Sequence, residues 1–488
     1  MSHHLSAFSY HLYRRFLEKF SALHFRFSLA ILLFLRSKQH MSRRCVIFGF
    51  GAVAQTTFKL IAKHLPISEY LLIDGRQLSE KELEITKGYK VTTVVRTFNN
   101  DTLEEGAFEL IKDDDMVFDF FGCADSLQII RACTRHKNVL YLNACLEEWE
   151  ELELPSGYQL YERMYNFRKT CPNKATACID AGANPGIITH FAILATFHMA
   201  QSAIDRKVHD ADKIKELLDK KDVAGLATQL QVDALHISEI ETIEPADEKL
   251  FEGATCNSWC VPSFHDEWMK ASEVSIGTSD REDLTKEGYS PVPESVPQST
   301  LIPFPLHLKT ACPNFTFTGR CVRHPETLEI SKVFHDTKTG HVPTVAFVYH
   351  PSRLPLQSMR QPNWKTLPKL IMSENYGGPL DGAETMGATL ISAREDIPPR
   401  WYGSILSCQQ ARDVECIMNP TTLQVAASAL AHMAVALKHP EQGICMPHDF
   451  DSEEIMEIAK PYLGTVWDGD LEVRLPSRWR DLIVDEVL

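Results

Sequence analysis

The sequence lacks a surplus of basic residues. Its 488 residues include 50 Lys and Arg against 65 Asp and Glu, which gives a formal net charge of −15. Proteins that bind DNA or RNA through the phosphate groups normally show the opposite balance. We therefore expect no nucleic-acid partner, whereas an acidic protein is compatible with a small cationic substrate.

The 13 cysteines lack the paired spacing of a structural zinc site. The closest two, Cys256 and Cys260, have three residues between them, and no second pair matches them. Structural zinc usually takes four ligands from two such pairs. An odd and scattered set indicates reduced, mostly buried thiols in a reducing compartment, so we expect a cytoplasmic protein without a metal.

The N-terminal region has no apolar run long enough to cross a membrane. Its run Leu29–Leu35 is short of the roughly 20 apolar residues that a spanning helix needs. Arg36 and Lys38 follow where a secretory signal would have small residues before a cleavage site. We interpret residues 1–40 as an extension that the fold does not need, with an interfacial membrane helix as the alternative, and we expect no membrane partner.

Three common catalytic signatures are missing as well. The sequence has no Walker A loop, no H-E-x-x-H and no G-x-S-x-G. P-loop NTPase, zinc peptidase and serine hydrolase activities therefore lose support.

Between Met41 and Gly182 short apolar runs alternate with amphipathic stretches. This rhythm is typical of a doubly wound parallel sheet, and we predict a Rossmann-type α/β domain over residues 41–182. The expected strands are Cys45–Phe50, Tyr70–Ile73, Val91–Val95, Met116–Phe121, Val139–Ala144 and Thr176–Ile179, and the expected helices include Ala52–Leu65, Ser126–His136 and Gln159–Lys169.

After Gly182 the pattern changes to shorter strand-like runs. It predicts an α+β domain with a mostly antiparallel sheet over residues 183–420, and the five prolines of Tyr289–Pro305 predict a loop there. Residues 421–488 are expected to be helical and to pack back on the first domain. The expected elements are helices at Gly186–Met199, Ala211–Leu218 and Thr421–Leu437, and strands at Leu235–Thr242, Val274–Ile276, Phe315–Arg320 and Thr344–Tyr349.

A dinucleotide-binding motif follows the first expected strand. Gly49-Phe50-Gly51-Ala52-Val53-Ala54 matches G-x-G-x-x-A, in which Gly49 permits the tight turn, Gly51 lets a pyrophosphate approach, and the small Ala54 allows close packing of the helix on the strand. Free N–H groups at the helix N-terminus attract the phosphates. Asp74, which lies 23 residues after Gly51 at the end of the second strand, favours NAD over NADP, although the nearby Arg76 weakens that preference.

Polar residues also follow the other expected strands, where ligands of open parallel sheets bind. Asp125, Asn143 and Asn184 are candidates for contacts with the cofactor. For Asp125 alone, capping of the following helix is an equally good explanation. Asn184 is able either to cap a helix or to contact the nicotinamide side.

Several of these segments together resemble bacterial homospermidine synthase, a family of the saccharopine dehydrogenase-like group. The resemblance runs from about Arg44 to the C-terminus. It is carried by Gly49–Ala54, Asn143–Trp149, Asp180–Gly186, His236–Glu239, Trp259 and His324-Pro325-Glu326.

The resemblance implies a reaction in which two putrescines form homospermidine and release ammonia, with spermidine as an alternative aminobutyl donor. Bound NAD would store a hydride while an amine becomes an imine, and would return it to the new imine. A homodimer is also implied.

The implied site residues suit a cationic substrate. Buried amines need carboxylates, a developing iminium is stabilised by an aromatic face, and proton transfers need an acid or base. Trp259 is the expected cation–π partner, and His324 the expected polar or proton-transfer partner. The carboxylates carried over are Glu147, with Glu148 in reserve, Glu239, Glu267 and Glu326.

Two other functions stay open at this point. A saccharopine- or carboxynorspermidine-type dehydrogenase would bind carboxylate substrates and should present arginines or lysines. A non-catalytic NAD-binding protein would keep the glycine turn without needing acids in the second domain.

Overall fold

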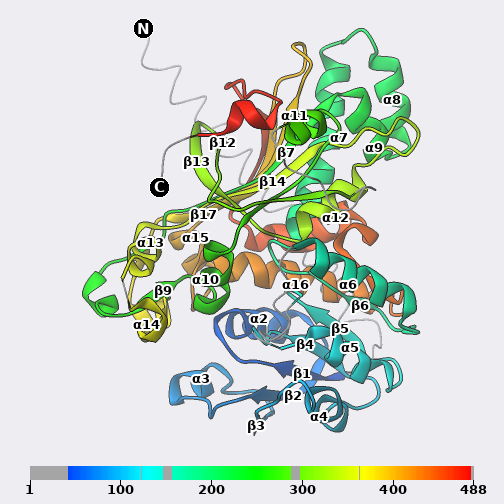
Figure 1. The fold of residues 1–488 in the computed structure, drawn as a ribbon. Helices are drawn as coiled ribbons and strands as arrows, with labels where there is room; N and C mark the ends of the chain where they lie inside the picture. Colours follow the sequence, from blue (N-terminus) through cyan, green and yellow to red (C-terminus); the bar gives the residue numbers. More distant parts are fainter. Residues whose placement is uncertain (1–41, 123, 147–156, 287–296, 362, 485–488) are drawn as a thin grey trace, which may run out of the picture.

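The computed structural model describes residues 42–122, 124–146, 157–286, 297–361 and 363–484. The chain forms two lobes, each built around one large sheet (Figure 1). The first lobe holds the N-terminal strands, and the second lobe holds most of the chain after residue 186.

The first sheet is parallel and has the strand order β19-β6-β5-β4-β1-β2-β3. Neighbouring side chains of β1 pack into two different apolar clusters. Ile47 belongs to one cluster and Phe48 to the other, so both faces of the sheet are covered. This confirms the expected Rossmann-type sheet. The strands are β1 (Arg43–Phe48), β2 (Ile67–Asp74), β3 (Val91–Val95), β4 (Met116–Asp119), β5 (Leu140–Asn143), β6 (Ala177–Cys178) and β19 (Ile444–Cys445).

The strand order reverses between β1 and β4. From β1 the chain proceeds outward through β2 and β3, and then returns to place β4 on the other side of β1. Loops leaving the carboxyl ends of two such strands diverge and open a crevice, which is where ligands of doubly wound sheets bind. The dinucleotide motif follows β1 and therefore lies at this crevice.

The second sheet has nine strands, and β7 pairs with a parallel neighbour, β14, and an antiparallel neighbour, β17. All its other pairings are antiparallel, which confirms the expected mostly antiparallel sheet. The strands are β7 (Val232–Glu241), β10 (Ser272–Ser275), β11 (Ser299–Ile302), β12 (His307–Cys312), β13 (Phe315–Val322), β14 (Thr344–His350), β17 (Ala383–Ser392), β18 (Arg400–Ser407) and β20 (Thr465–Asp470).

Strand β11 corrects the prediction of a loop over Tyr289–Pro305. It lies between Pro297 and Pro303 at the edge of the second sheet, paired with β10 alone. Proline cannot donate a backbone hydrogen bond, so it excludes a central strand but permits a short edge strand between two prolines.

Two long apolar helices lie in the interior, and the second of them contacts both lobes. α7 (Ile187–Asp205) packs on β17 and β18 of the second sheet, and α16 (Pro420–Lys438) packs on α2 (Ala52–His64), on β5 and β6, and on β17 (Figure 1). Among the described residues, these two helices have the length and composition to cross a membrane. However, 72% of the apolar 18-residue stretch of α7 and 94% of that of α16 are buried inside the protein. Their apolar character is therefore explained by burial inside the protein.

Shorter elements complete the structure. Two small two-stranded sheets pair β8 (Glu244–Pro245) with β16 (Leu380–Asp381), and β9 (Thr255–Asn257) with β15 (Lys369–Ile371). The remaining helices are α3 (Glu80–Ile85), α4 (Leu103–Leu110), α5 (Ser126–Thr134), α6 (Gly157–Thr170), α8 (Ala211–Asp219), α9 (Val223–Gln229), α10 (Val261–Met269), α11 (Arg281–Lys286), α12 (Glu326–Val333), α13 (Arg353–Met359), α14 (Glu374–Gly377), α15 (Cys408–Asp413) and α17 (Ser452–Ala459).

The indole of Trp401 fills the space above a pair of glycines in the second sheet. Gly387 and Gly403 are direct partners across β17 and β18, and a Cβ added to Gly387 would lie 2.4 Å from the Trp401 ring. The Trp401 Nε1–H donates a hydrogen bond of 2.8 Å to the Ser238 hydroxyl of β7. The glycine at position 387 is therefore required by the close packing of this ring.

We expect Gly387→Ala to lower the free energy of unfolding by about 1–3 kcal/mol, because the ring or the strand must shift to admit the methyl group. Urea denaturation measures the change. Gly75→Ala is the control, since its nearest neighbouring atom would lie 3.9 Å away. Equal stability of the two variants would contradict this account of the packing.

Candidate active site

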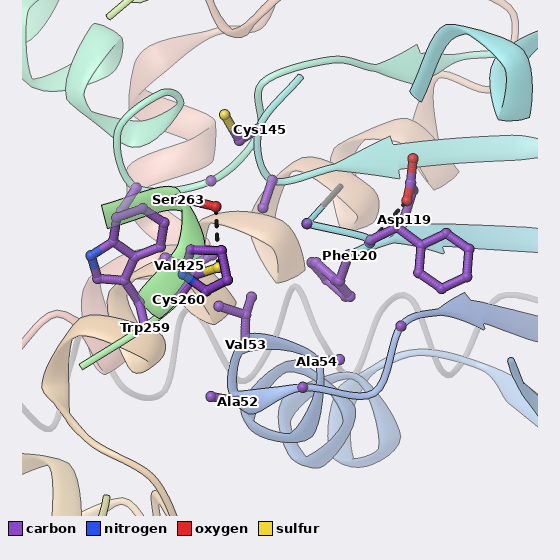
Figure 2. Close-up of a pocket in the computed structure, with 18 of the residues that line it drawn as sticks. Ala52, Val53, Ala54, Asp119, Phe120, Cys145, Trp259, Cys260, Ser263 and Val425 are labelled. Carbon is purple, nitrogen blue, oxygen red and sulfur yellow. Dashed lines mark hydrogen bonds between the residues drawn. The ribbon is translucent and has the colours of Figure 1, made fainter. Parts of the chain in front are cut away.

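A cavity of about 740 Å³ lies where the two lobes meet. Its walls come from the loops after β1, β2, β4, β5 and β6, from β7, β14 and β17, and from the beginnings of α10 and α16. Figure 2 shows Trp259, Cys260 and Ser263 of the second lobe opposite the first turn of α2, from which the Val53 side chain points toward them. The cavity therefore joins the dinucleotide motif to the candidate amine-binding residues.

The glycine turn has the geometry of a phosphate cradle. Gly49 has φ +78°, and a Cβ there would lie 2.7 Å from the carbonyl oxygen of Phe120, so a side chain is excluded. A Cβ on Gly51 would meet no atom within 4 Å, since this residue faces the cavity. Gly51 is also the N-cap of α2 and provides no side-chain cap, which leaves the N–H groups of the first turn for an anion. These residues fit a dinucleotide pyrophosphate.

Asp74 lies beside the turn at the end of β2. One carboxylate oxygen accepts a hydrogen bond of 2.9 Å from the Phe50 N–H, and the other accepts one of 3.1 Å from the Arg76 N–H. The Arg76 guanidinium is turned to Glu82, with N–O distances of 2.5 and 2.8 Å. A carboxylate thus faces the ribose position while the arginine is paired elsewhere, which favours NAD over NADP at this position.

Two predicted cofactor residues lie outside the cavity wall. Asp125 caps α5 by accepting from the Leu127 N–H at 3.0 Å, and it forms an ion pair with Arg163. Asn143 is fully buried at the end of β5, where its side-chain oxygen accepts from the Asp180 N–H at 2.8 Å. In the described structure both side chains support the loops of the site and do not line the cavity.

Trp259 is held by two asparagines. The side-chain oxygen of Asn257 accepts from the N–H groups of Trp259 and Cys260, at 2.8 and 3.2 Å. The Asn419 amide donates to the carbonyl of Ser258, at 2.5 Å, and to that of Met372, at 2.8 Å. Asn419 also caps α16, so the loop that carries the indole is tied to a helix between the lobes.

Glu239 enters the cavity from β7. It is 6% exposed, and the Asn184 amide donates a hydrogen bond to its carboxylate. Burial raises the pKa of Glu239 to about 8; the neighbouring Glu241 adds to this effect, whereas the Asn184 hydrogen bond opposes it. In the described structure no lysine or arginine forms an ion pair with Glu239, and a cation in the cavity would stabilise its ionised form.

Glu267 and His324 also line the cavity, and Glu326 lies directly behind His324. The His324 Nε2 atom is 3.9 Å from a Glu267 oxygen, and its Nδ1 atom is 3.6 Å from a Glu326 oxygen. Burial, with a smaller effect from Arg323, lowers the pKa of His324 to about 3. Burial and the neighbouring carboxyls Asp180, Glu329, Glu239 and Glu267 raise the pKa of Glu326.

Sequence reasoning missed three groups beside Glu239. Glu241 and Glu384 are each 1% exposed and are direct partners across β7 and β17, while Tyr349 is the partner of Glu239 on β14 and lines the cavity. Burial raises the pKa of Glu241 to about 7 and also raises that of Glu384. Glu239 and Glu241 are separated by one residue, which places both side chains on the same face of a strand, but only strand pairing brings in Glu384.

The remaining candidate, Glu147, lies outside the described residues, as does its alternative Glu148. The structure therefore brings together Gly49, Gly51, Val53, Ala54 and Asp74 on one side, and Asn184, Glu239, Trp259, Glu267 and His324 on the other.

Comparisons with known proteins agree with this arrangement. The family model for the saccharopine dehydrogenase NADP binding domain matches residues 45–179. Curated homospermidine synthases from Mesorhizobium japonicum and Blastochloris viridis are 27% and 26% identical to this chain, each over 86% of it and over 89% and 90% of their own lengths.

A solved structure shares the fold. The crystal structure of homospermidine synthase from Legionella pneumophila in complex with NAD matches with a TM-score of 0.76 and 24% identity, over 91% of this chain and 98% of that one. The chain thus carries a Rossmann domain of the saccharopine dehydrogenase type. Over most of its length it resembles the homospermidine synthases, which confirms the resemblance seen in the sequence. The matched family model is that of an NADP binding domain, and the solved structure contains NAD.

The buried carboxyls predict how stability depends on pH. The folded-state pKa values of Glu239, Glu241 and Asp180, about 8, 7 and 7, exceed the unfolded value of about 4. Their contribution to stability is therefore fully present below about pH 4 and is lost as the pH rises through 7 to 8. Without a bound cation, the free energy of unfolding should fall between about pH 4 and pH 8, measured by urea denaturation.

Glu239→Gln should make this pH dependence shallower, by up to about 1.4 kcal/mol per pH unit, because the amide resembles the protonated acid and cannot ionise. The exposed Glu252→Gln is the control and should leave the dependence unchanged. A dependence in Glu239→Gln as steep as in the unchanged protein would show that Glu239 does not titrate in this range.

Proposed function

We propose that the protein is a homospermidine synthase, which transfers an aminobutyl group from putrescine or spermidine to putrescine and releases ammonia. The supporting observation is the shared cavity, in which a phosphate cradle faces an indole and buried carboxyls. NAD is the proposed cofactor, held by Gly49, Gly51 and the first turn of α2, with Asp74 at the ribose.

The charge of the cavity favours a diamine over an amino acid. Its arginines, Arg76 and Arg96, lie next to Asp74, since the backbone N–H groups of both donate to that residue. On the amine side, the described lining residues with charge are Glu239 and Glu267. A carboxylate substrate would lack a cationic partner there, which argues against saccharopine- and carboxynorspermidine-type dehydrogenases.

Trp259 and Glu239 have complementary tasks in this proposal. The bound nicotinamide supplies hydride storage, so that an amine carbon is first oxidised and later reduced again. The Trp259 face stabilises the positive charge that develops on the substrate nitrogen. Glu239, oriented by Asn184, binds the substrate ammonium and holds the proton that the nitrogen must lose.

His324, Glu267 and Glu326 would serve the second amine and the departing ammonia. His324 lies between the two carboxyls, so a proton moved from one side can be held on the other. Because burial keeps His324 neutral, its ring can donate at one nitrogen while it accepts at the other.

The proposal also includes a homodimer, as the resemblance to homospermidine synthase implies, and a location in the cytoplasm. Analytical ultracentrifugation tests the oligomeric state. The activity is tested by mass analysis of the products formed from putrescine and NAD by the purified protein. Homospermidine and ammonia without net NADH support the synthase. Accumulating NADH with an amino-acid substrate would identify a dehydrogenase instead, and no chemistry with either substrate would leave a non-catalytic NAD-binding protein.

We expect Trp259→Ala to reduce turnover of putrescine by about 30-fold or more, since a desolvated cation–π contact contributes about 2 kcal/mol or more. NAD affinity, measured by fluorescence titration, should change little because the indole lies opposite the glycine turn. Trp259→Phe, which keeps an aromatic face, is the matched control and should retain more activity. Parallel loss of NAD binding and turnover would contradict the cation–π role.

Asp74→Asn should weaken NAD binding by about tenfold or more and affect NADP much less, because hydrogen bonds to a charged group contribute about 1.5–3 kcal/mol. Dissociation constants for both dinucleotides, measured by isothermal titration, provide the test. Similar constants for NAD in both proteins would remove Asp74 from the ribose contact.

A further inference from the structure

A row of four titratable side chains leads from the cavity to the protein surface. It begins at His324 in the cavity wall, continues through Glu326 and Glu329 on α12, and ends at His448 in a short helical turn, Pro447–Asp449. The function proposed above needs only the first two of these residues. Glu329 and His448 have no task in it.

The outer half of the row is joined by a hydrogen bond. The His448 Nδ1 atom lies 2.8 Å from a Glu329 oxygen, and Glu329 is 2% exposed while the His448 side chain is 28% exposed. His448 lines a surface pocket of about 460 Å³ together with Lys332 and Ser452. It therefore connects a fully buried carboxyl to a pocket on the surface.

The inner half of the row contains buried polar atoms without partners. Within the described structure, His324 Nδ1, both Glu326 oxygens and the second Glu329 oxygen make no hydrogen bond. Glu326 and Glu329 are three residues apart on one helix, so their side chains lie on the same face. Buried polar atoms of this kind are normally satisfied by ordered water, and water between these groups would make the row continuous.

Charged groups from several elements surround the row. Asp180, which follows β6, accepts a hydrogen bond of 2.7 Å from the Leu146 N–H. Burial is the largest cause of the raised pKa of Glu326, and the charge of Asp180 is the next largest. At the outer end, Arg168 of α6 and Asp449 face His448. Burial lowers the pKa of His448, but the hydrogen bond and charge of Glu329 and the charge of Asp449 outweigh it, so that the net pKa is raised. The pKa values of Glu326 and His448 are thus both raised, so each of these groups keeps a proton to higher pH than it would in water.

We propose that His324, Glu326, Glu329 and His448, with intervening water, form a proton path between the amine-binding end of the cavity and the surface. The inference rests on the proposed function. Polyamines enter protonated, whereas an amine can react only when neutral. One N–H bond of the ammonium breaks and leaves its electron pair on nitrogen, and an O–H bond forms on a carboxylate of the path. The same path returns a proton to the departing ammonia.

His448→Ala is the test, and its readout is homospermidine formation from putrescine. We expect kcat to fall by about tenfold and KM for putrescine to stay within about twofold, since His448 is remote from the substrate and moves only the proton. Added imidazole should restore most of the lost rate, because the surface pocket gives it access to Glu329. A purely structural role of His448 would not be rescued in this way.

Two further variants complete the design. Glu329→Gln has the same size and should give the same loss, but without rescue by imidazole, because the missing carrier is then the buried carboxyl. His198→Ala is the matched control: its Nδ1 atom also lies 2.8 Å from a carboxylate, that of Asp468, yet it faces no part of the row. Its kcat should be unchanged.

The outcomes separate the inference from the function on which it rests. If the unchanged protein forms no homospermidine from putrescine and NAD, the proposed function fails and the inference fails with it. If the unchanged protein is active and either His448→Ala or Glu329→Gln retains full kcat, the proton path alone is overturned. Loss of rate in His448→Ala without imidazole rescue would also overturn it.

Discussion

Carboxyl groups buried without a cation of their own are the constraint on which this structure depends. Glu239, Glu241 and Glu384 occupy adjacent strands in the interior of the second lobe, and no ion pair with lysine or arginine compensates them in the described residues. An isolated charge there is costly, so the groups must be protonated or face a bound cation. Of these three residues Glu239 lines the cavity, so a carboxyl that lowers stability at high pH also offers a partner to a bound cation.

The opposite wall of the cavity shows how a rigid frame supports this arrangement. Asn419 caps α16 and at the same time fixes the loop before Trp259, while α16 packs against α2, the helix that follows the glycine turn. The distance between indole and cradle is thus set by one helix between the lobes. Because the support consists of buried hydrogen bonds and apolar packing, it holds the reacting groups in place before any ligand arrives.

Much of this could be predicted from the sequence, and the failures have physical causes. The first sheet was predictable because its strands are continuous apolar runs, and the glycine turn because Gly49 and Gly51 follow the first of them. A family resemblance was needed to predict Trp259, Glu267 and His324. Nothing in the sequence around these residues distinguishes an active-site residue from a surface residue. Glu384 could not be found, because its partner Glu241 is distant in sequence and is met only by strand pairing. β11 was missed because prolines within a run suggest a loop, whereas an edge strand tolerates them at its ends.

Residues 444–484 return to both halves of the molecule. β19 extends the first sheet beside β6, and β20 then extends the second sheet beside β18. Because this segment contributes a strand to each sheet, a large rotation of one lobe relative to the other would disturb the pairing of these edge strands as well as the packing of the helices. We therefore expect the cavity to keep nearly the same width when ligands bind, so that ligands are selected by whether their length and charge fit a gap that already exists.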